Sequence, residues 1–198
     1  MEDIRARILE AATRVYTEAG FRGTTTRRVA QEADVNEVTL FRHFGTKDAL
    51  VKAALSCAHC PGAMPPLGEP GDVEAELHTW AWELYHRWYG ARHLISRVLG
   101  DLVEHPQIAP AICEEPQSEH AELSRYLGRL RDVGLARNEF FPDAAAGMLI
   151  GAIFTHAVWR DHFGATLPPP EEVIRHYVAL LLQSVGYRQA PAGRKVRP

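Results

Sequence analysis

The segment 36–44, Asn36-Glu-Val-Thr-Leu-Phe-Arg-His-Phe44, carries side chains that suit contact with the edges of nucleic-acid bases. At helical spacing, Leu40 and Phe44 share a face with Val35, and we expect that face to pack against a core. The major groove of DNA is about 12 Å wide and admits one helix. We therefore predict a helix that enters the groove, with the following side chains pointing outward: Glu37, Val38, Thr39, Phe41 and His43.

Neighbouring elements must hold such a helix in place. Apolar residues recur every three or four positions from 4 to 19, which predicts a helix closed by Gly20. A short helix is predicted over 26–33, a tight break at Asp34, and a third helix capped by Asn36. Thr46 can cap a fourth helix. Spacing alone leaves open whether this bundle presents a helix to DNA or is only a packing module.

The residues of this N-terminal bundle resemble those of the TetR family of transcriptional regulators, densely and without a gap over about the first fifty positions. The resemblance implies a DNA-binding domain followed by a divergent, all-helical domain that in this family binds small molecules and dimerises. It rests on these runs: Ile8-Leu-Glu-Ala-Ala12, Gly20-Phe21, Thr24-Thr-Thr-Arg-Arg-Val-Ala30, Ala33-Asp-Val-Asn36 and Thr39-Leu-Phe-Arg-His-Phe-Gly-Thr-Lys-Asp-Ala-Leu50.

The resemblance also carries the family's DNA contacts onto positions of this chain. Base contacts fall on Arg27, Glu37, Val38 and Thr39, and phosphate contacts fall on Thr26, Phe41, His43 and Lys47. Arg28 and Asn36 complete the predicted interface. The chemistry agrees, because arginine can donate to guanine O6 and N7, glutamate can accept from cytosine N4, and apolar groups can meet a thymine methyl.

Three residues depart from the family pattern. Phe41 stands where the family usually has tyrosine, so a hydrogen bond from that ring to phosphate is missing. Asp34 replaces a glycine of the turn, which is tolerable because aspartate enters the left-handed region more easily than most residues. Val38 replaces a frequent glycine and changes which bases are read.

We predict an all-α fold: an N-terminal three-helix helix-turn-helix domain followed by a larger helical ligand-binding and dimerisation domain. The expected domains are 1–46 for DNA binding and 47–187 for effector binding and dimerisation, followed by a basic tail, 188–198, expected to be disordered. A proline- and glycine-rich stretch at 60–71 precedes helices predicted near 72–89, 91–104, 110–133, 143–163 and 171–187, with a break at Gly90.

The helix predicted at 72–89 is unusually rich in aromatic residues. Aromatic walls with a few polar tips suit a pocket for a flat apolar molecule, although the same rings could simply fill a helical core. With the resemblance, this predicts a repressor that binds a palindromic operator as a dimer and is released by a small apolar or aromatic molecule. The predicted ligand contacts are Trp80, Tyr85, Trp88, Leu94, Val98 and Met148.

The last two predicted helices carry small residues on one helix and a broad apolar surface on the other. Small residues let helices approach closely, and the last helix has more apolar surface than one face within a monomer can hide. Two such helices from each chain would form a four-helix homodimer interface, as the resemblance implies. The predicted dimer contacts are Gly147, Gly151, Ile174, Tyr177, Val178 and Leu181.

The motif Cys57-Ala-His-Cys60 offers an alternative, a metal- or thiol-sensing regulator. A lone Cys-x-x-Cys has a high false-positive risk. We therefore expect no metal site and no cofactor. The chain lacks the Gly-x-Ser-x-Gly, His-Glu-x-x-His and phosphate-binding glycine motifs, so we expect no enzyme.

Composition places the chain among ordinary globular proteins, with 198 residues, 46% hydrophobic and 24% charged. The net charge of the chain is −3, and basic residues outnumber acidic ones only weakly, in the N-terminal segment 22–47. No apolar run is long enough to span a membrane and no secretory signal precedes the first helix, so we expect a cytoplasmic protein.

Overall fold

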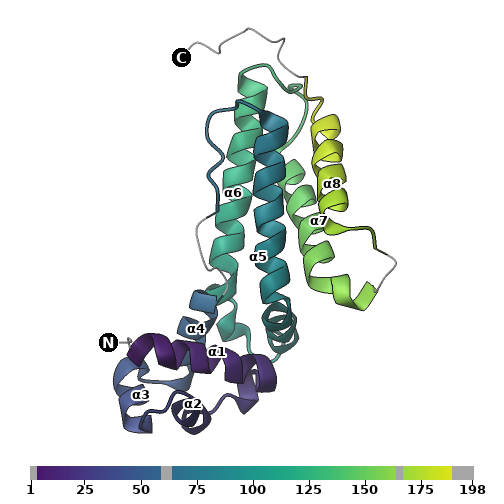
Figure 1. The fold of residues 1–198 in the computed structure, drawn as a ribbon. Helices are drawn as coiled ribbons and strands as arrows, with labels where there is room; N and C mark the ends of the chain where they lie inside the picture. The colour runs from purple at the N-terminus through teal and green to yellow at the C-terminus, as the bar shows by residue number, and fades with distance from the viewer. Residues whose placement is uncertain (1–3, 59–63, 164–166, 189–198) are drawn as a thin grey trace. The chain divides into compact units, whose positions relative to one another are not determined.

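The computed structural model describes residues 4–58, 64–163 and 167–188, and the regular elements in that part of the chain are all helical (Figure 1). Side chains are described except at 58, 111–116 and 163, and residues 189–198 of the predicted tail lie outside the description. Among the described helices, none is long and apolar enough to cross a membrane. The elements are α1 (Ile4–Gly23), α2 (Thr26–Glu32), α3 (Glu37–Phe44), α4 (Lys47–Ala58), α5 (Val73–Asp101), the short 3-10 helix η1 (Pro106–Ile108), α6 (Pro110–Asp132), α7 (Pro142–Phe163) and α8 (Pro170–Ser184).

Helix α5 corrects the sequence prediction, because it continues through Gly90 instead of ending there. A glycine inside a helix costs about 1 kcal/mol relative to alanine. Burial of apolar side chains on both sides, Trp88 before the glycine and Leu94 and Val98 after it, offsets this cost. The helices predicted at 72–89 and 91–104 are therefore one helix.

The chain divides into two compact units, and α5 and α6 each contribute to both. The first unit contains residues 1–63 and 86–116, and the second contains 64–85 and 117–198. The predicted boundary between residues 46 and 47 separates the expected DNA-binding segment from the expected effector-binding segment, and it stays a prediction.

The first unit is built on α1, which contacts α2 and α4, while α3 contacts α2 and α4 (Figure 1). The side chains that fill this core are small or branched, and those of α1 recur at helical spacing, as the sequence predicts. The core residues are Ile8, Leu9, Ala11, Ala12, Val15, Val29, Ala30, Ala33, Leu40, Leu50 and Ala54.

The end of α1 bends at Gly20 and is held against the last turns of α5. Gly20 has φ 68° and ψ −173°, a conformation essentially restricted to glycine. The next backbone amide, that of Phe21, donates to Asp101 Oδ2 at 2.8 Å, and Arg97 Nη2 donates to the Glu18 carbonyl oxygen at 3.1 Å. The predicted end of the first helix at Gly20 is thus a kink that two charged side chains of α5 stabilise.

In the second unit α7 and α8 lie side by side (Figure 1). The segments that follow α6 and α8 are joined by two backbone hydrogen bonds, Arg137 N to Val185 O at 3.0 Å and Arg188 N to Leu135 O at 2.9 Å. Tyr187 N also donates to Leu182 O at 2.9 Å. These bonds hold Tyr187 at the end of α8.

His156 on α7 is an ionisable side chain in the core of the second unit, and it is 4% exposed. Its Nε2 accepts from Arg160 Nη1 at 2.7 Å, and its ring lies 5.8 Å from that of Tyr85 and 6.2 Å from that of Tyr177 between centroids. Burial, and secondarily the positive charge of Arg160, lower the pKa of His156. The imidazole is therefore neutral in the folded protein near neutral pH.

We expect folding stability to fall as pH drops below about 6.5, the pKa of an unperturbed histidine. The unfolded chain takes up a proton at position 156 in that range, whereas the folded chain takes it up only at lower pH, so acid favours unfolding. His156→Gln should reduce this loss, as measured by urea unfolding at pH 7.5 and pH 5.5. The matched control, His93→Gln at an exposed position of α5, should keep the wild-type pH dependence. Equal pH dependence in wild type and His156→Gln would contradict the prediction.

Candidate nucleic-acid interface

A clamped turn joins α2 to α3. Asp34 adopts φ 50°, the left-handed conformation expected at this position, and Val35 N donates to Ala30 O at 3.0 Å. From α1, Arg7 Nη2 donates to the carbonyl oxygens of Ala33 at 2.7 Å and Asp34 at 3.1 Å. The angle between the two helices is therefore held by α1 as well as by the turn itself.

Helix α3 presents apolar side chains to solvent at one face. Its N-cap Asn36 accepts from Val38 N at 2.9 Å, as predicted. Leu40 is fully buried, which confirms the predicted inward face. Val38 and Phe41 are 65% and 46% exposed, although both are apolar. An exposed apolar tip on a short, capped helix is suited to contact with base edges.

Two of the predicted DNA contacts are bonded to each other. The hydroxyl of Thr26, at the start of α2, donates to Glu37 Oε1 at 2.5 Å. This bond fixes the direction of the Glu37 carboxylate and leaves its second oxygen available to accept from a base. The two helices of the motif are thus joined by a side-chain contact as well as by the turn.

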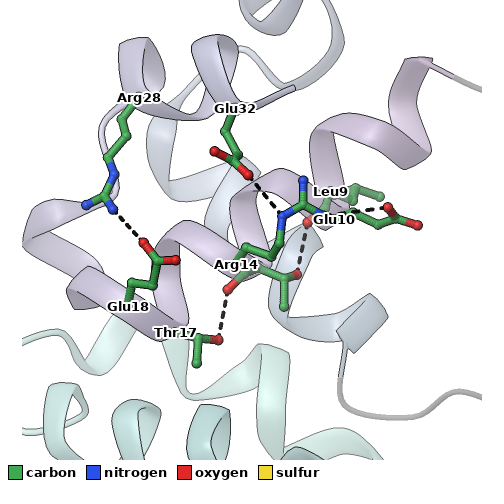
Figure 2. Close-up of polar contacts among 8 residues, drawn as sticks. Leu9, Glu10, Arg14, Thr17, Glu18, Arg28 and Glu32 are labelled. Atoms are coloured by element: carbon green, nitrogen blue, oxygen red, sulfur yellow. Dashed lines mark hydrogen bonds and ion pairs between the residues drawn. The ribbon is translucent and has the colours of Figure 1, made fainter. Parts of the chain in front are cut away.

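Ion pairs from α1 orient α2, and Figure 2 shows them together. Glu18 pairs with Arg28 at 2.7 Å, and Arg14 pairs with Glu32 at 3.1 Å. Exposed pairs of this kind contribute about 0–1 kcal/mol to stability, so their main consequence is the direction of the side chains. In contrast, the described part of the chain offers no hydrogen-bond or ion-pair partner to the guanidinium of Arg27, which is exposed.

Lys47 begins α4 and lies over the ring of Phe21, with its ammonium nitrogen 4.5 Å from the ring centroid. Burial lowers the pKa of Lys47, and the neighbouring carboxylate of Asp48 opposes that effect. The cap of α4 is the predicted one, because Thr46 Oγ1 accepts from Ala49 N at 3.1 Å. The ring of Phe21 thus positions the ammonium group of Lys47 at the start of α4.

The side chains that support the interface were not predicted from the sequence. Arg7, Glu18 and Phe21 make the clamp, the ion pair and the cation contact, respectively. For the charged residues of α1 a signal exists, since Arg14 and Glu18 are four residues apart and share one helical face. For Phe21 no local signal exists, because its contact with Lys47 joins two helices.

The residues predicted to contact an effector lie in different parts of the fold. Trp80 and Tyr85 are buried in the second unit, whereas Leu94 and Val98 are buried in the first unit with Tyr16, Phe21 and Leu55. Trp88 is buried and Met148 is 68% exposed. Met148 lines a groove of about 220 Å³ on α7 and α8, together with Tyr177 and Leu181. A pocket made from the whole predicted set stays a prediction.

The residues predicted at a dimer interface divide in a similar way. Ile174, Val178 and Leu181 are buried inside the chain itself. Gly151 is exposed, and Gly147 and Tyr177 are half-buried. The exposed apolar surface of α7 and α8 comes instead from Met148, Trp159 and Leu180, of which only Met148 was singled out from the sequence, and for another role.

Cys57 is exposed near the end of α4, and Cys60 lies outside the described residues. No group of three or more histidine, cysteine or acidic side chains that could hold a metal ion occurs in the described part of the chain.

Two short capped helices joined by a clamped turn, with a third helix packed behind them, define a helix-turn-helix DNA-binding protein. Residues 8–54 match the family model for bacterial regulatory proteins of the tetR family. The chain is 29% identical over 192 residues to the HTH-type transcriptional regulator YvkB of Bacillus subtilis, covering 93% of this chain and 98% of that protein. It is 48% identical over 54 residues to an HTH-type transcriptional repressor of Mycobacterium tuberculosis, covering 27% of this chain and 29% of that one.

A crystal structure of a TetR-family transcriptional regulator from Mesorhizobium loti shares the fold, with a TM-score of 0.70 at 20% identity over 91% of this chain and 96% of that chain. Residues 8–54 thus carry the DNA-binding domain of the TetR family of bacterial regulatory proteins, and over nearly its whole length the chain is similar to an HTH-type transcriptional regulator. The predicted fold class is confirmed: an N-terminal helix-turn-helix domain followed by a larger helical domain.

Proposed function

We propose that this chain is a repressor that binds a palindromic DNA operator as a homodimer and is released by a small molecule. The exposed tip of α3 carries the proposal, because Val38 and Phe41 stand in solvent on a helix whose other face is buried. The relative of Mycobacterium tuberculosis that is 48% identical over 54 residues is named a repressor. Metal or thiol sensing is the alternative, and the comparisons do not favour it.

In this proposal α3 lies in the major groove and the start of α2 lies against the backbone. Arg27, Glu37, Val38 and Thr39 contact bases, and Thr26, Arg28, Asn36, Phe41, His43 and Lys47 contact the phosphates or orient the motif. Arg27 has an unpaired guanidinium in the described structure, whereas Arg28 is paired with Glu18. We therefore assign base reading to Arg27 and orientation of α2 to Arg28.

Two copies are needed because one short helix reads too few bases for a specific site. In a two-fold dimer the two α3 helices must lie about 34–36 Å apart to enter successive major grooves. The exposed apolar side chains of α7 and α8 offer the surface for pairing, with Gly147 and Gly151 permitting close approach. An effector that favours a different distance between the two α3 helices would release the DNA.

For the effector we propose a small apolar or aromatic molecule that contacts the aromatic residues of α5. Trp80 is fully buried, and its Nε1 hydrogen has no acceptor among the described residues. A ligand that opens the packing around Trp80 and Tyr85 could supply that acceptor, because buried donors are otherwise costly to leave unpaired. Screening small molecules for loss of operator binding tests this part of the proposal.

Selection of bound sequences from random DNA should return a palindrome, and variants of the motif should then separate base contacts from phosphate contacts. Arg27→Ala should cost about 1–3 kcal/mol of binding free energy and relax base choice at defined positions. Lys47→Ala should weaken binding to all sequences alike. It should also reduce the slope of the logarithm of the binding constant against the logarithm of salt concentration by about one. Fluorescence anisotropy at several salt concentrations measures both effects.

The matched control is Arg42→Ala, an exposed arginine on α3 outside the predicted interface, and it should change affinity least. Unaltered affinity and base preference in Arg27→Ala would show that α2 and α3 are not placed on DNA as proposed.

A further inference from the structure

A groove of about 570 Å³ lies between the N-terminal half of α5 and α8, within the second unit. This volume is in the range of small-molecule sites, about 300–1,000 Å³. Its apolar lining comes from Ala75 on α5 and from Val178, Ala179 and Leu182 on α8. The described structure thus provides a surface for an aliphatic body.

Polar groups line the same groove and are almost all without partners. Within the described residues, the side chains of Glu74, Thr79, Gln183 and Tyr187 make no hydrogen bond or ion pair. His78 also lines it, and its Nε2 is buried without a hydrogen-bond partner. Of these groups only His78 Nε2 is a buried atom left unsatisfied, which is unusual in a folded protein, whereas Glu74, Thr79 and Gln183 are exposed and thus available to a ligand.

The end of the groove nearest the start of α5 is electronegative. Burial, and then the carboxylates of Glu74, Asp72 and Glu76, raise the pKa of the Tyr187 hydroxyl. Asp72 already accepts from Ala75 N at 3.2 Å, and Glu76 accepts from Gly71 N at 3.0 Å. Glu74 is therefore the carboxylate that remains available to a ligand.

The one arginine of this lining already has an acidic partner. Arg175 pairs with Glu171 at 3.1 Å, one helical turn earlier on α8. An anionic ligand would compete with Glu171 for this guanidinium and would approach Glu74 as well. A cationic ligand meets an unpaired carboxylate and no unpaired cation, so the charges of the groove favour a cation.

Helix α8 uses a different face for this groove than for its contact surface with α7. Arg175, Ala179 and Leu182 recur at four and three residues and form one stripe. Tyr177, Leu180 and Leu181 line the groove on the α7 side. At 3.6 residues per turn, the two stripes lie on roughly opposite sides of the helix. A dimer formed through α7 and α8 would leave the α5–α8 groove accessible.

We propose that the α5–α8 groove binds a small organic amine, with the ammonium group at the Glu74 carboxylate and the Tyr187 hydroxyl oxygen and the aliphatic body on Val178, Ala179 and Leu182. His78 Nε2 and the side chain of Gln183 supply further hydrogen-bonding positions for a polar substituent. This site goes beyond the proposed effector contacts, which lie among the buried aromatic residues. Its test is direct binding, so it stands or falls separately from operator binding.

The probes are octylamine, octanoate and 1-octanol, which share one aliphatic chain and differ in the head group. Isothermal titration calorimetry of the full chain should show octylamine binding at one site per chain and at least tenfold more tightly than the other two. Equal affinity for octanoate or octanol would overturn the assignment to amines. Absence of octylamine binding at millimolar concentration would overturn the site.

Substitutions of groove residues test whether the probe binds in the groove. Glu74→Gln should weaken octylamine binding at least tenfold, and Ala179→Trp, at an exposed position, should abolish it by filling the groove. The control Glu83→Gln removes an exposed carboxylate of α5 that does not line the groove, and it should bind like wild type. Operator binding in the absence of probe should be the same in all three variants. If Glu74→Gln and Ala179→Trp both bind octylamine normally, the amine lies elsewhere and the proposal is wrong.

Discussion

Replacing Leu180 by arginine is expected to convert the protein to a monomer and to reduce affinity for a palindromic operator at least 100-fold. Leu180 is 60% exposed and lines the α7–α8 groove with Met148, which is 68% exposed. In the proposed dimer this surface is covered by a second copy, and an arginine there would be buried without a partner. A monomer has only one DNA-binding domain, so it loses the avidity of two linked contacts, which raises operator affinity by a factor of about 10²–10⁴.

Light scattering measures the mass, and fluorescence anisotropy measures operator affinity in the same samples. Because Leu180 is exposed in the chain, Leu180→Arg should still unfold cooperatively, at a urea concentration that, unlike that of the wild-type dimer, does not depend on protein concentration. The matched control is Ala179→Arg, which places the same charge on the opposite stripe of α8 and should leave a dimer. A dimer that survives Leu180→Arg would move the interface away from α7 and α8.

Substituting Gly20 by alanine should lower the free energy of unfolding of the first unit by about 3 kcal/mol. Its φ of 68° and ψ of −173° cost a residue with a side chain about 1–3 kcal/mol. A Cβ atom there would also lie 3.0 Å from both Arg97 Nε and Asp101 Oδ2. Asp101 would have to shift by a few tenths of an ångström, which would weaken its charge-assisted bond to the Phe21 amide, a bond worth about 1.5–3 kcal/mol.

Urea unfolding gives the loss of stability, and hydrogen exchange at the Phe21 amide reports on the bond to Asp101. The control is Gly45→Ala, because Gly45 also has a positive φ, 72°, but nothing lies within 4 Å of its added Cβ. Since Gly45 has φ 72° and ψ −51°, the substitution should cost about 1–3 kcal/mol through backbone strain alone and leave exchange at Phe21 unchanged. Equal losses in the two variants would mean that the contacts with α5 add nothing to the backbone strain.

Local chemistry was enough to predict the helices and the turn of the N-terminal motif, whereas its assignment to DNA binding needed the family resemblance. The cap Asn36, the turn at Asp34 and the inward face of Leu40 depend on residues within four positions of one another, because caps, turns and helical periodicity are short-range effects. For the same reason the sequence located α1 to α4 closely. The family resemblance then added roles to side chains whose positions were already predicted.

Continuity of α5 through Gly90 could not be predicted in this way. The local preference of glycine favours a break, and the helix persists because apolar side chains before and after that glycine are buried by other elements. The same limit applies to Val178 and Leu181, which are predicted as dimer contacts and are nearly buried within the chain itself, so their place in a dimer stays a prediction. Periodicity identifies an apolar face but not what covers it.

The contacts that connect the motif to the rest of its unit, and the groove on α8, depend on tertiary structure alone. Phe21 bonds to Asp101 across 80 positions of sequence, and Glu74 and Tyr187, from opposite ends of the second unit's sequence, line one groove. A residue's type and spacing determine which bonds it can make. Which partner it finds is decided by the packing of distant helices, since burial and charge act through space and not along the chain.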